Sequence, residues 1–330
     1  MEIPAPQGLS RPATILPYTP LYRASLWNFA IFMARHLPPF LLEHITIQAC
    51  LLYWMLFRTR RRVVQENLKP AVHNDPLAAR IATRELYQQL GVKLADLWRY
   101  ESGLSIYNLF HDLTGWEHYT RATERGRGVL LVTIHLGNWE FGAPLLTERG
   151  IKLQVITLAE HETKLTEMRQ RARARWGIET IALGEDPFAS LEVIRRLEDK
   201  GTVALLMDRP PEKTAVTINL FRQPFAASVA AAELARATGC AILPVYLPRT
   251  ARGYVAHILP EILYERPSLR GLGARVALTQ RIMSAFEPAI RLYLNQWYHF
   301  LPIWGGVKGS PLSAPAEATS PALDLNGPPP

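Results

Sequence analysis

The sequence predicts an α/β protein with a mostly parallel central sheet flanked by helices. Three largely apolar runs without a charged residue predict the sheet, because strands that are buried on both faces have this composition. They are Val129–Ile134, Leu153–Leu158 and Thr202–Met207. Segments with helical periodicity separate these runs. Strands that alternate with helices form βαβ units, in which the strands lie parallel.

The chain of 330 residues is long enough for one large α/β domain with an N-terminal appendage. Its formal net charge of +8 comes from two segments. Residues 1–70 hold eight Lys/Arg against three Asp/Glu, and residues 161–175 hold five Lys/Arg against two Asp/Glu. Basic patches on a neutral body indicate an anionic surface or ligand. Without a zinc-finger, RNP-type or basic-zipper pattern, we expect no nucleic-acid partner. Cys50 and Cys240 lie in apolar surroundings, which favours a reducing compartment.

Residues 1–20 are proline-rich and lack the apolar run of a signal peptide, so we predict an irregular arm. Two aromatic-rich apolar segments follow, Ala24–Ala34 and Phe40–Phe57. Apolar helices followed by a basic cluster are typical of segments that lie in or dip into an anionic leaflet. We therefore predict that residues 21–62 are membrane-associated helices on the cytoplasmic face of the inner membrane. The alternative is two core helices of a soluble protein. The basic cluster consists of Arg58, Arg60, Arg61 and Arg62.

Residues 63–310 are predicted to form the α/β domain. Residues 311–330, which are mainly Pro, Ala and Ser, are predicted to be a disordered tail. Leucines at helical spacing predict a helix over Pro76–Phe110. The other predicted elements are a basic helix ending at Trp176, strands at Glu179–Leu183 and Ala241–Leu247, and helices at Phe188–Lys200, Ala230–Thr238 and Arg275–Leu294.

The first of the three apolar runs ends on His135, and Glu140 follows five residues later. Gly137 permits a bend between them, and Asn138 is a good N-cap for the next helix. Glu140 is then expected to reach back to His135, fix its tautomer and leave the other ring nitrogen as a base. The alternative is a core histidine beside a helix cap. No third ligand is positioned for zinc, so we expect no metal.

Asp208 and Arg209 also follow an apolar run, so they are expected at the same edge of the sheet as His135. Such an aspartate can hold a basic partner, and such an arginine can hold phosphate. The alternative is a surface ion pair. Arginines also alternate along the basic helix, where at most two can face one ligand; these are Arg169, Arg171, Arg173 and Arg175.

Several blocks of the chain resemble one family in the right order. "HLGNWE" is similar to the H-x4-D/E motif of the bacterial lipid A biosynthesis acyltransferases, the lauroyl/myristoyl transferases of the lysophospholipid acyltransferase superfamily. "RRVVQENL", "MDRP", "ELARATGCAILPVY" and, more loosely, "YLNQWYHFLPIW" match further blocks, so the resemblance covers Leu21 to Trp304. It departs from the family where "FAASVAAAELA" leaves Ser228 as the only hydroxyl and where "WYHFLPIW" lacks the usual arginine.

The resemblance implies that His135 is a general base oriented by Glu140, with Arg173 and Asp208 in the site. It implies a membrane-bound O-acyltransferase that moves an acyl chain from a thioester, expected on acyl carrier protein, to a hydroxyl of a lipid A precursor or similar anionic lipid. No cofactor is implied. Amides near Gly137 and Asn138 are expected to stabilise the oxyanion, and Arg173 and Arg209 to contact phosphate or carrier. The alternatives are a glycerolipid or amino-lipid acyltransferase and a non-catalytic membrane-associated binding protein.

Overall fold

The computed structural model describes residues 23–158, 162–183 and 189–307. The predicted arm (1–20) and tail (311–330) lie outside these residues. The strands are β1 (Phe110–Thr114), β2 (Val129–Thr133), β3 (Leu153–Leu158), β4 (Glu179–Leu183), β5 (Thr202–Leu206), β6 (Ala215–Leu220), β7 (Gln223–Ser228), β8 (Ala241–Tyr246), β9 (Arg249–Thr250) and β10 (Gly253–Ile258). The α-helices are α1 (Ala24–His36), α2 (Pro39–Leu56), α3 (Arg58–Leu68), α4 (Pro76–Glu101), α5 (Trp116–Glu124), α6 (Gly142–Glu148), α7 (Thr163–Ala174), α8 (Ala189–Glu198), α9 (Ala230–Thr238), α10 (Leu272–Ser284) and α11 (Glu287–Leu292).

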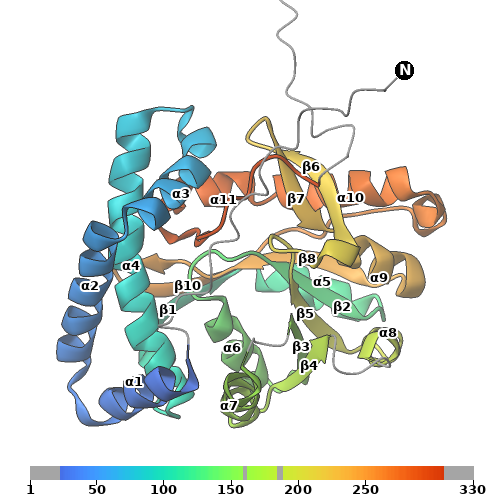
Figure 1. Cartoon of the computed structure of the whole chain (residues 1–330). Helices are drawn as coiled ribbons and strands as arrows, with labels where there is room; N and C mark the ends of the chain where they lie inside the picture. The colour runs from blue at the N-terminus through green and yellow to red at the C-terminus, as the bar shows by residue number, and fades with distance from the viewer. Residues whose placement is uncertain (1–22, 159–161, 184–188, 308–330) are drawn as a thin grey trace, which may run out of the picture.

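Within the described residues, the central sheet has eight strands in the order β1–β10–β8–β2–β5–β3–β4, with β9 paired to β10 (Figure 1). From β8 to β4 the neighbouring strands are all parallel. The exceptions lie on the other side, where β10 runs antiparallel to both β8 and β9. Strands β6 and β7 form a separate hairpin. The predicted fold class, a mostly parallel sheet flanked by helices, is confirmed.

Helices cover both faces of the sheet, and the alternation of side chains along β2 shows which helices cover which face. Val129 and Leu131 pack in a cluster with side chains of α5 and α6. Leu130 and Val132 point to the opposite face and pack in the cluster that contains α8 and α9. All four side chains are at most 2% exposed. This double burial is the physical reason that the strand has no charged residue.

Two predicted helices differ from the structure in where they end, because tertiary contacts or local breaks in the helix set those ends. The helix predicted over Pro76–Phe110 ends at Glu101, and Phe110 instead begins β1, which pairs with β10. The helix predicted over Arg275–Leu294 is divided into α10 and α11, because Pro288 lacks the N–H that a continuous helix requires at that point.

The hairpin β6–β7 was not predicted from the sequence. Its turn consists of Phe221 and Arg222, whose φ angles are 50° and 62°. A two-residue turn with positive φ at both positions usually contains Asn or Gly, and that signal is absent here. The side chain of Phe221 is 6% exposed and packs in the main core, so tertiary packing compensates for the strained turn.

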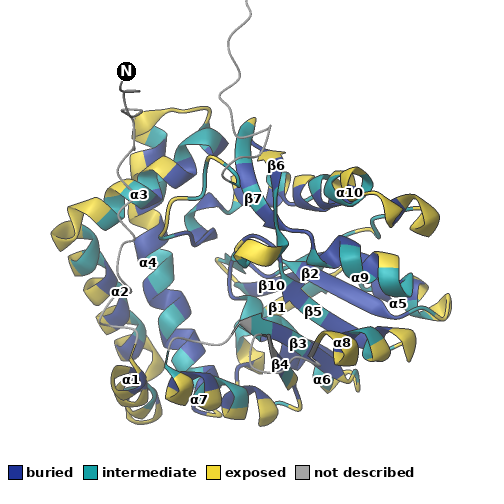
Figure 2. Ribbon diagram, turned by 45° about the vertical axis from the view of Figure 1, so that its right-hand side comes forward, coloured by how far each residue is buried: buried dark blue, intermediate teal, exposed yellow. Residues whose placement is uncertain are grey.

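The N-terminal helices pack one face against α4 and turn the other face outward (Figure 2). Gly91 of α4 allows the close approach of α2, because a Cβ at that position would lie 2.5 Å from the Cα of Ile47. Neither α1 nor α2 is buried on all sides, since large apolar side chains of both helices are exposed. The most exposed are Phe29, Phe32, Phe40, Met55 and Leu56. The predicted boundary between residues 62 and 63 falls inside α3.

Candidate active site

The register of two neighbouring parallel strands brings His135 and Asp208 together. Thr133 at the end of β2 is paired with Leu206 at the end of β5. His135 and Asp208 each follow two residues later, at the carboxyl edge where ligands gather in such sheets. The prediction that Asp208 lies at the same edge as His135 is confirmed. The alternative of a surface ion pair is wrong, because Asp208 is only 2% exposed.

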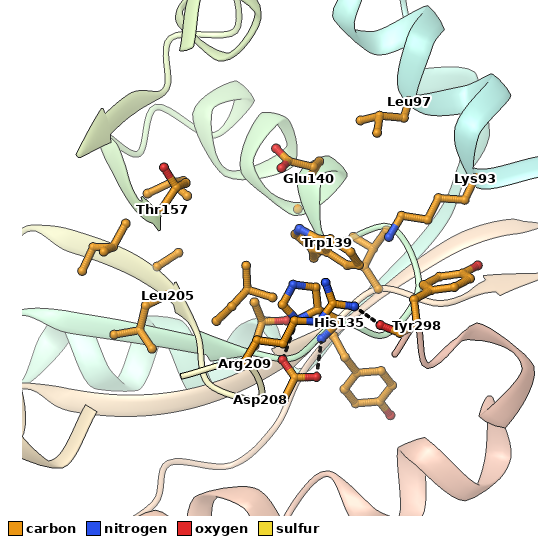
Figure 3. A pocket seen from close by; sticks show the side chains of 18 of the residues that line it. Lys93, Leu97, His135, Trp139, Glu140, Thr157, Leu205, Asp208, Arg209 and Tyr298 are labelled. Atoms are coloured by element: carbon orange, nitrogen blue, oxygen red, sulfur yellow. Dashed lines mark hydrogen bonds and ion pairs between the residues drawn. The ribbon is translucent and has the colours of Figure 1, made fainter. Parts of the chain in front are cut away.

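Asp208 holds the imidazole of His135 and accepts four hydrogen bonds (Figure 3). Its Oδ1 lies 2.6 Å from His135 Nδ1. Its Oδ2 accepts from the amide of His135 at 2.9 Å, from Nε2 of His299 at 2.8 Å and from Nε1 of Trp297 at 3.3 Å. The imidazole is therefore fixed in orientation, and no described residue hydrogen-bonds its Nε2.

Burial sets the protonation of His135, and the neighbouring histidines set that of Asp208. Burial, reinforced by the positive charge of Arg209, lowers the pKa of His135 to about 3, although Asp208 opposes the shift. Burial acts to raise the pKa of Asp208, but His135 and His299 outweigh it and hold that pKa well below its usual range. At neutral pH the site thus contains a carboxylate and a neutral imidazole, whose Nδ1–H donates to Asp208 and whose Nε2 carries a lone pair.

The loop after His135 is fixed by the C-terminal segment of the described chain. The amide of Gly137 donates to the carbonyl of Gln296 at 2.9 Å, and the amide of Tyr298 donates to the carbonyl of His135 at 2.8 Å. Gly137 has a φ of 63°, and a Cβ there would lie 2.0 Å from the carbonyl oxygen of Leu247. The predicted bend at Gly137 is confirmed, and only glycine fits it.

The prediction that Glu140 orients His135 is wrong. The carboxylate of Glu140 points away from the imidazole (Figure 3) and forms two hydrogen bonds with Arg173, at 2.9 and 2.6 Å. Glu140 lies in a short 3-10 helix, Trp139–Phe141, so the turn between His135 and Glu140 directs its side chain toward α7. Arg173 is 7% exposed, and Arg169 also lies 3.4 Å from Glu140. The two arginines that face one ligand therefore face a carboxylate of the protein itself.

The side chains of Glu140 and Arg173 are only 10% and 9% exposed, so we expect Glu140→Gln to lower the free energy of unfolding by about 3–5 kcal/mol. Burial acts to raise the pKa of Glu140, but Arg173 outweighs it and lowers the pKa to about 2. The stabilisation is therefore present above about pH 4.5, the ordinary value, and is lost as the pH falls through about 2. Denaturant unfolding measures the change.

The matched control for this prediction is Glu167→Gln. Glu167 forms an exposed pair with Arg171 on α7, and such pairs contribute about 0–1 kcal/mol. A loss at Glu140 no larger than the loss at Glu167 would show that burial adds nothing to this ion pair.

Asn138 and Arg209 make contacts that the sequence did not predict. Asn138 is fully buried, and its side chain does not cap a helix. The amides of Gly137 and Asn138 are occupied by the carbonyls of Gln296 and Leu247, so the expected use of these amides for an oxyanion is wrong. Arg209 is exposed beside the site and donates from Nη2 to the carbonyl of Tyr298.

A cavity of about 1850 Å³ lies over the carboxyl edge of the sheet and is lined mainly by apolar side chains. His135 and Asp208 line it together with Trp27 of α1, Leu42 of α2 and Leu97 of α4. Side chains of α1, α2 and α4 therefore line the same cavity as the His135–Asp208 pair. Small-molecule sites are usually about 300–1,000 Å³, so there is room for a larger ligand.

Sequence reasoning missed three residues of the site. Trp297 and His299 contact Asp208, and Lys93 of α4 lies over the ring of Trp139. Trp297 and His299 belong to the block "YLNQWYHFLPIW", where a histidine among aromatic residues was the available signal. Lys93 carries no such signal, because nothing in its own segment distinguishes it from a solvated lysine on a helix.

The fold and the site together define an α/β protein with a histidine held by a buried aspartate at the edge of a large apolar cavity. The chain belongs to the family of bacterial lipid A biosynthesis acyltransferases, whose family model matches residues 13–305. The family resemblance of its sequence motifs is thereby confirmed.

Curated relatives share part of their length with this chain. It is 27% identical over 194 residues to a phosphatidylinositol mannoside acyltransferase of Mycobacterium tuberculosis, which is 58% of each protein. The corresponding protein of Mycolicibacterium smegmatis is 26% identical over 196 residues, 58% of this chain and 62% of that one. The chain thus matches less than two thirds of the length of these relatives.

Among solved structures, the chain is similar to the 1-acyl-sn-glycerophosphate acyltransferase PlsC from Thermotoga maritima. The alignment has a TM-score of 0.35 and 12% identity, and it covers 75% of this chain and 97% of that one. At this TM-score the similarity supports no conclusion about function.

Proposed function

We propose that this protein is a membrane-associated O-acyltransferase that moves a fatty acyl chain from an acyl thioester to a hydroxyl of an anionic glycolipid. The observation that carries the proposal is the neutral imidazole of His135. Asp208 holds its Nδ1 side, and Nε2 remains for a substrate in an apolar cavity. Membership of an acyltransferase family supports the same reaction.

The geometry supports His135 as the general base. Nε2 removes the proton of the acceptor hydroxyl while its oxygen attacks the thioester carbonyl. Asp208, rather than Glu140, fixes the tautomer and stabilises the imidazolium that forms, because it is the carboxylate bonded to Nδ1. The imidazolium then returns the proton to the leaving thiolate, so that the products are an ester and a thiol.

The cavity supports a long acyl chain as the transferred group. Its apolar lining and its volume of about 1850 Å³ suit a fatty chain together with part of a lipid. Arg209 is exposed and lines the same cavity, so it is positioned to contact a phosphate of the acceptor or of the donor. For the donor we propose an acyl carrier protein, whose acidic surface complements the arginines at the start of α3.

The acceptor is proposed from what the family and the relatives have in common. The family is named for lipid A and the relatives for phosphatidylinositol mannoside, and both compounds are sugar-containing lipids that carry phosphate. A sugar hydroxyl of an anionic glycolipid is therefore the acceptor that we propose.

A transfer assay with the full-length protein in detergent tests this function. Acyl carrier protein and coenzyme A thioesters of several chain lengths serve as donors. A lipid A precursor, a phosphatidylinositol mannoside and a lysophosphatidic acid serve as acceptors, and mass spectrometry detects the new ester. Acylation of the lysophosphatidic acid alone would show that the acceptor is a glycerolipid. No transfer from either donor to any acceptor would overturn the proposed activity.

We further propose that the exposed apolar face of α1 and α2 contacts the membrane. Helix α2 is long and apolar enough to cross a bilayer, and only 17% of it is buried. Phe40 and Leu56 of this helix are 74% and 66% exposed. We expect Phe40→Asp and Leu56→Asp each to weaken co-sedimentation with vesicles of anionic phospholipid by about tenfold or more, because each removes an apolar side chain from the lipid.

The control for membrane binding is Leu272→Asp. Leu272 is 57% exposed at the start of α10, and α10 lies on the other side of the molecule from α2 (Figure 1). If all three variants bind the vesicles as the unmodified protein does, the membrane face has been assigned to the wrong surface.

A further inference from the structure

A buried lysine lies in the wall of the cavity close to the His135–Asp208 pair. Lys93 of α4 is 6% exposed, and its Nζ lies 3.0 Å from the ring centre of Trp139 and 4.4 Å from that of Tyr298. The ring of Trp139 in turn lies 4.6 Å from the ring of His135. Trp139 is thus in contact with both side chains, and Figure 3 shows the ammonium group of Lys93 directed toward it.

Among the residues that the structure describes, the ammonium group of Lys93 lacks the ionic partner that a lysine buried to this degree usually has. Within the described part of the chain, no carboxylate forms an ion pair with it and no oxygen accepts a hydrogen bond from it. Contacts with two ring faces offset part of the cost of burying a charge. They use none of its three N–H donors in a conventional hydrogen bond. The N–H groups of Lys93 therefore remain able to donate hydrogen bonds. Because Lys93 lies in the cavity wall, a ligand in the cavity can accept them.

The charges around Lys93 adjust its acidity. Burial, reinforced by Arg209 and Arg169, lowers the pKa of Lys93 well below its usual value, while Glu140 and Asp208 oppose the shift. An ammonium group with a lowered pKa is a stronger hydrogen-bond donor. A hydrogen bond from Nζ becomes stronger when negative charge develops on the acceptor oxygen.

Acyl transfer creates such a charge, and the loop beside His135 does not provide donors for it. The amides of His135, Leu136, Gly137 and Asn138 are all occupied, by Asp208, Ile134, Gln296 and Leu247 respectively. An oxyanion near His135 must therefore find a donor other than these four amides.

We propose that Lys93 stabilises the oxyanion of the acyl transfer, by donating from Nζ to the carbonyl oxygen of the acyl thioester as that oxygen becomes negative. This inference rests on the function proposed above. As the acceptor oxygen bonds to the carbonyl carbon, the π electrons of the carbonyl move to its oxygen, which Lys93 faces. When the carbonyl forms again, the carbon–sulfur bond breaks, and the thiolate takes the proton from His135.

The test is Lys93→Met, which removes the charge and keeps a linear side chain, with Lys93→Gln as a second variant. Lys152→Met is the matched control, because Lys152 is exposed just before β3, at the opposite edge of the sheet. We expect kcat to fall by about 10²–10³-fold at Lys93, the usual effect of losing one oxyanion donor. KM for donor and acceptor, the melting temperature and the control variant are expected to change little.

The two KM values separate this role from simple anion binding. If Lys93 binds a phosphate of a substrate, Lys93→Met raises the KM of that substrate and leaves kcat unchanged, and the inference is overturned. Unchanged kinetics in a folded Lys93→Met or Lys93→Gln protein overturn it as well. Measuring His135→Ala beside them shows which proposal has failed. If His135→Ala is inactive and Lys93→Met is fully active, only the role of Lys93 is wrong.

Discussion

Replacing His135 with alanine is expected to lower the turnover of acyl transfer by about 10²–10⁴-fold, the usual effect of losing a general base. The side chain makes one hydrogen bond, to Asp208, and its Nε2 is used by no described residue. Its removal therefore changes the chemistry more than the packing. Steady-state transfer by purified protein measures the loss, and a melting curve confirms that the variant is folded.

The control for this experiment is His111→Ala, since His111 is exposed in β1 and has no place in the site. The pH profile of kcat/KM provides a second measurement. A base must be deprotonated to act, and burial lowers the pKa of His135 to about 3. The acidic limb of the unmodified protein is therefore expected well below pH 6.5, the ordinary value for histidine. If His135→Ala retains more than about a tenth of the turnover, general-base catalysis by this residue is excluded.

Asp208→Asn is expected to lower kcat by about 10²–10⁴-fold, although Asp208 does not touch the substrate. The carboxylate accepts from His135 Nδ1, from the amide of His135 and from His299 and Trp297. An amide in its place offers one acceptor oxygen and no charge. It can neither fix one tautomer of His135 nor stabilise the imidazolium. We expect a smaller effect on stability, about 1–3 kcal/mol, because donors that relied on Asp208 lose a partner.

Comparison with Glu140→Gln makes this prediction decisive. Both positions carry a buried carboxylate, but one holds His135 and the other holds Arg173. We expect Asp208→Asn to lose more turnover and Glu140→Gln to lose more stability. Parallel measurements of kcat and of denaturant unfolding show which variant loses more turnover and which loses more stability. If Glu140→Gln lost more turnover and Asp208→Asn lost more stability, Glu140 would be the residue that orients His135, as the sequence motif predicts.

The parallel strands β2, β3, β4, β5 and β8 were predicted because their composition is apolar, whereas β1, β6, β7, β9 and β10 were not predicted. The run Val129–Ile134 contains no charged residue, since both of its faces pack against helices, and the same holds for Thr202–Met207. Predictions failed where the deciding contact was distant in sequence. Phe110 begins a strand because it pairs with β10, and no local pattern distinguishes it from the end of the preceding helix.

The sequence by itself determined the fold class, the family and the identity of His135 as the residue at a strand end followed by a glycine bend. These features are local, because a buried strand and a turn with positive φ constrain the residue types within a few positions of each other. The tertiary structure alone decided which carboxylate holds the histidine. Glu140 is five residues from His135 in the chain, but the 3-10 turn directs it to Arg173, whereas strand register brings Asp208 to the ring from 73 residues away. The same reason applies to His299 and Lys93, which reach the site from segments that only the folded chain brings together.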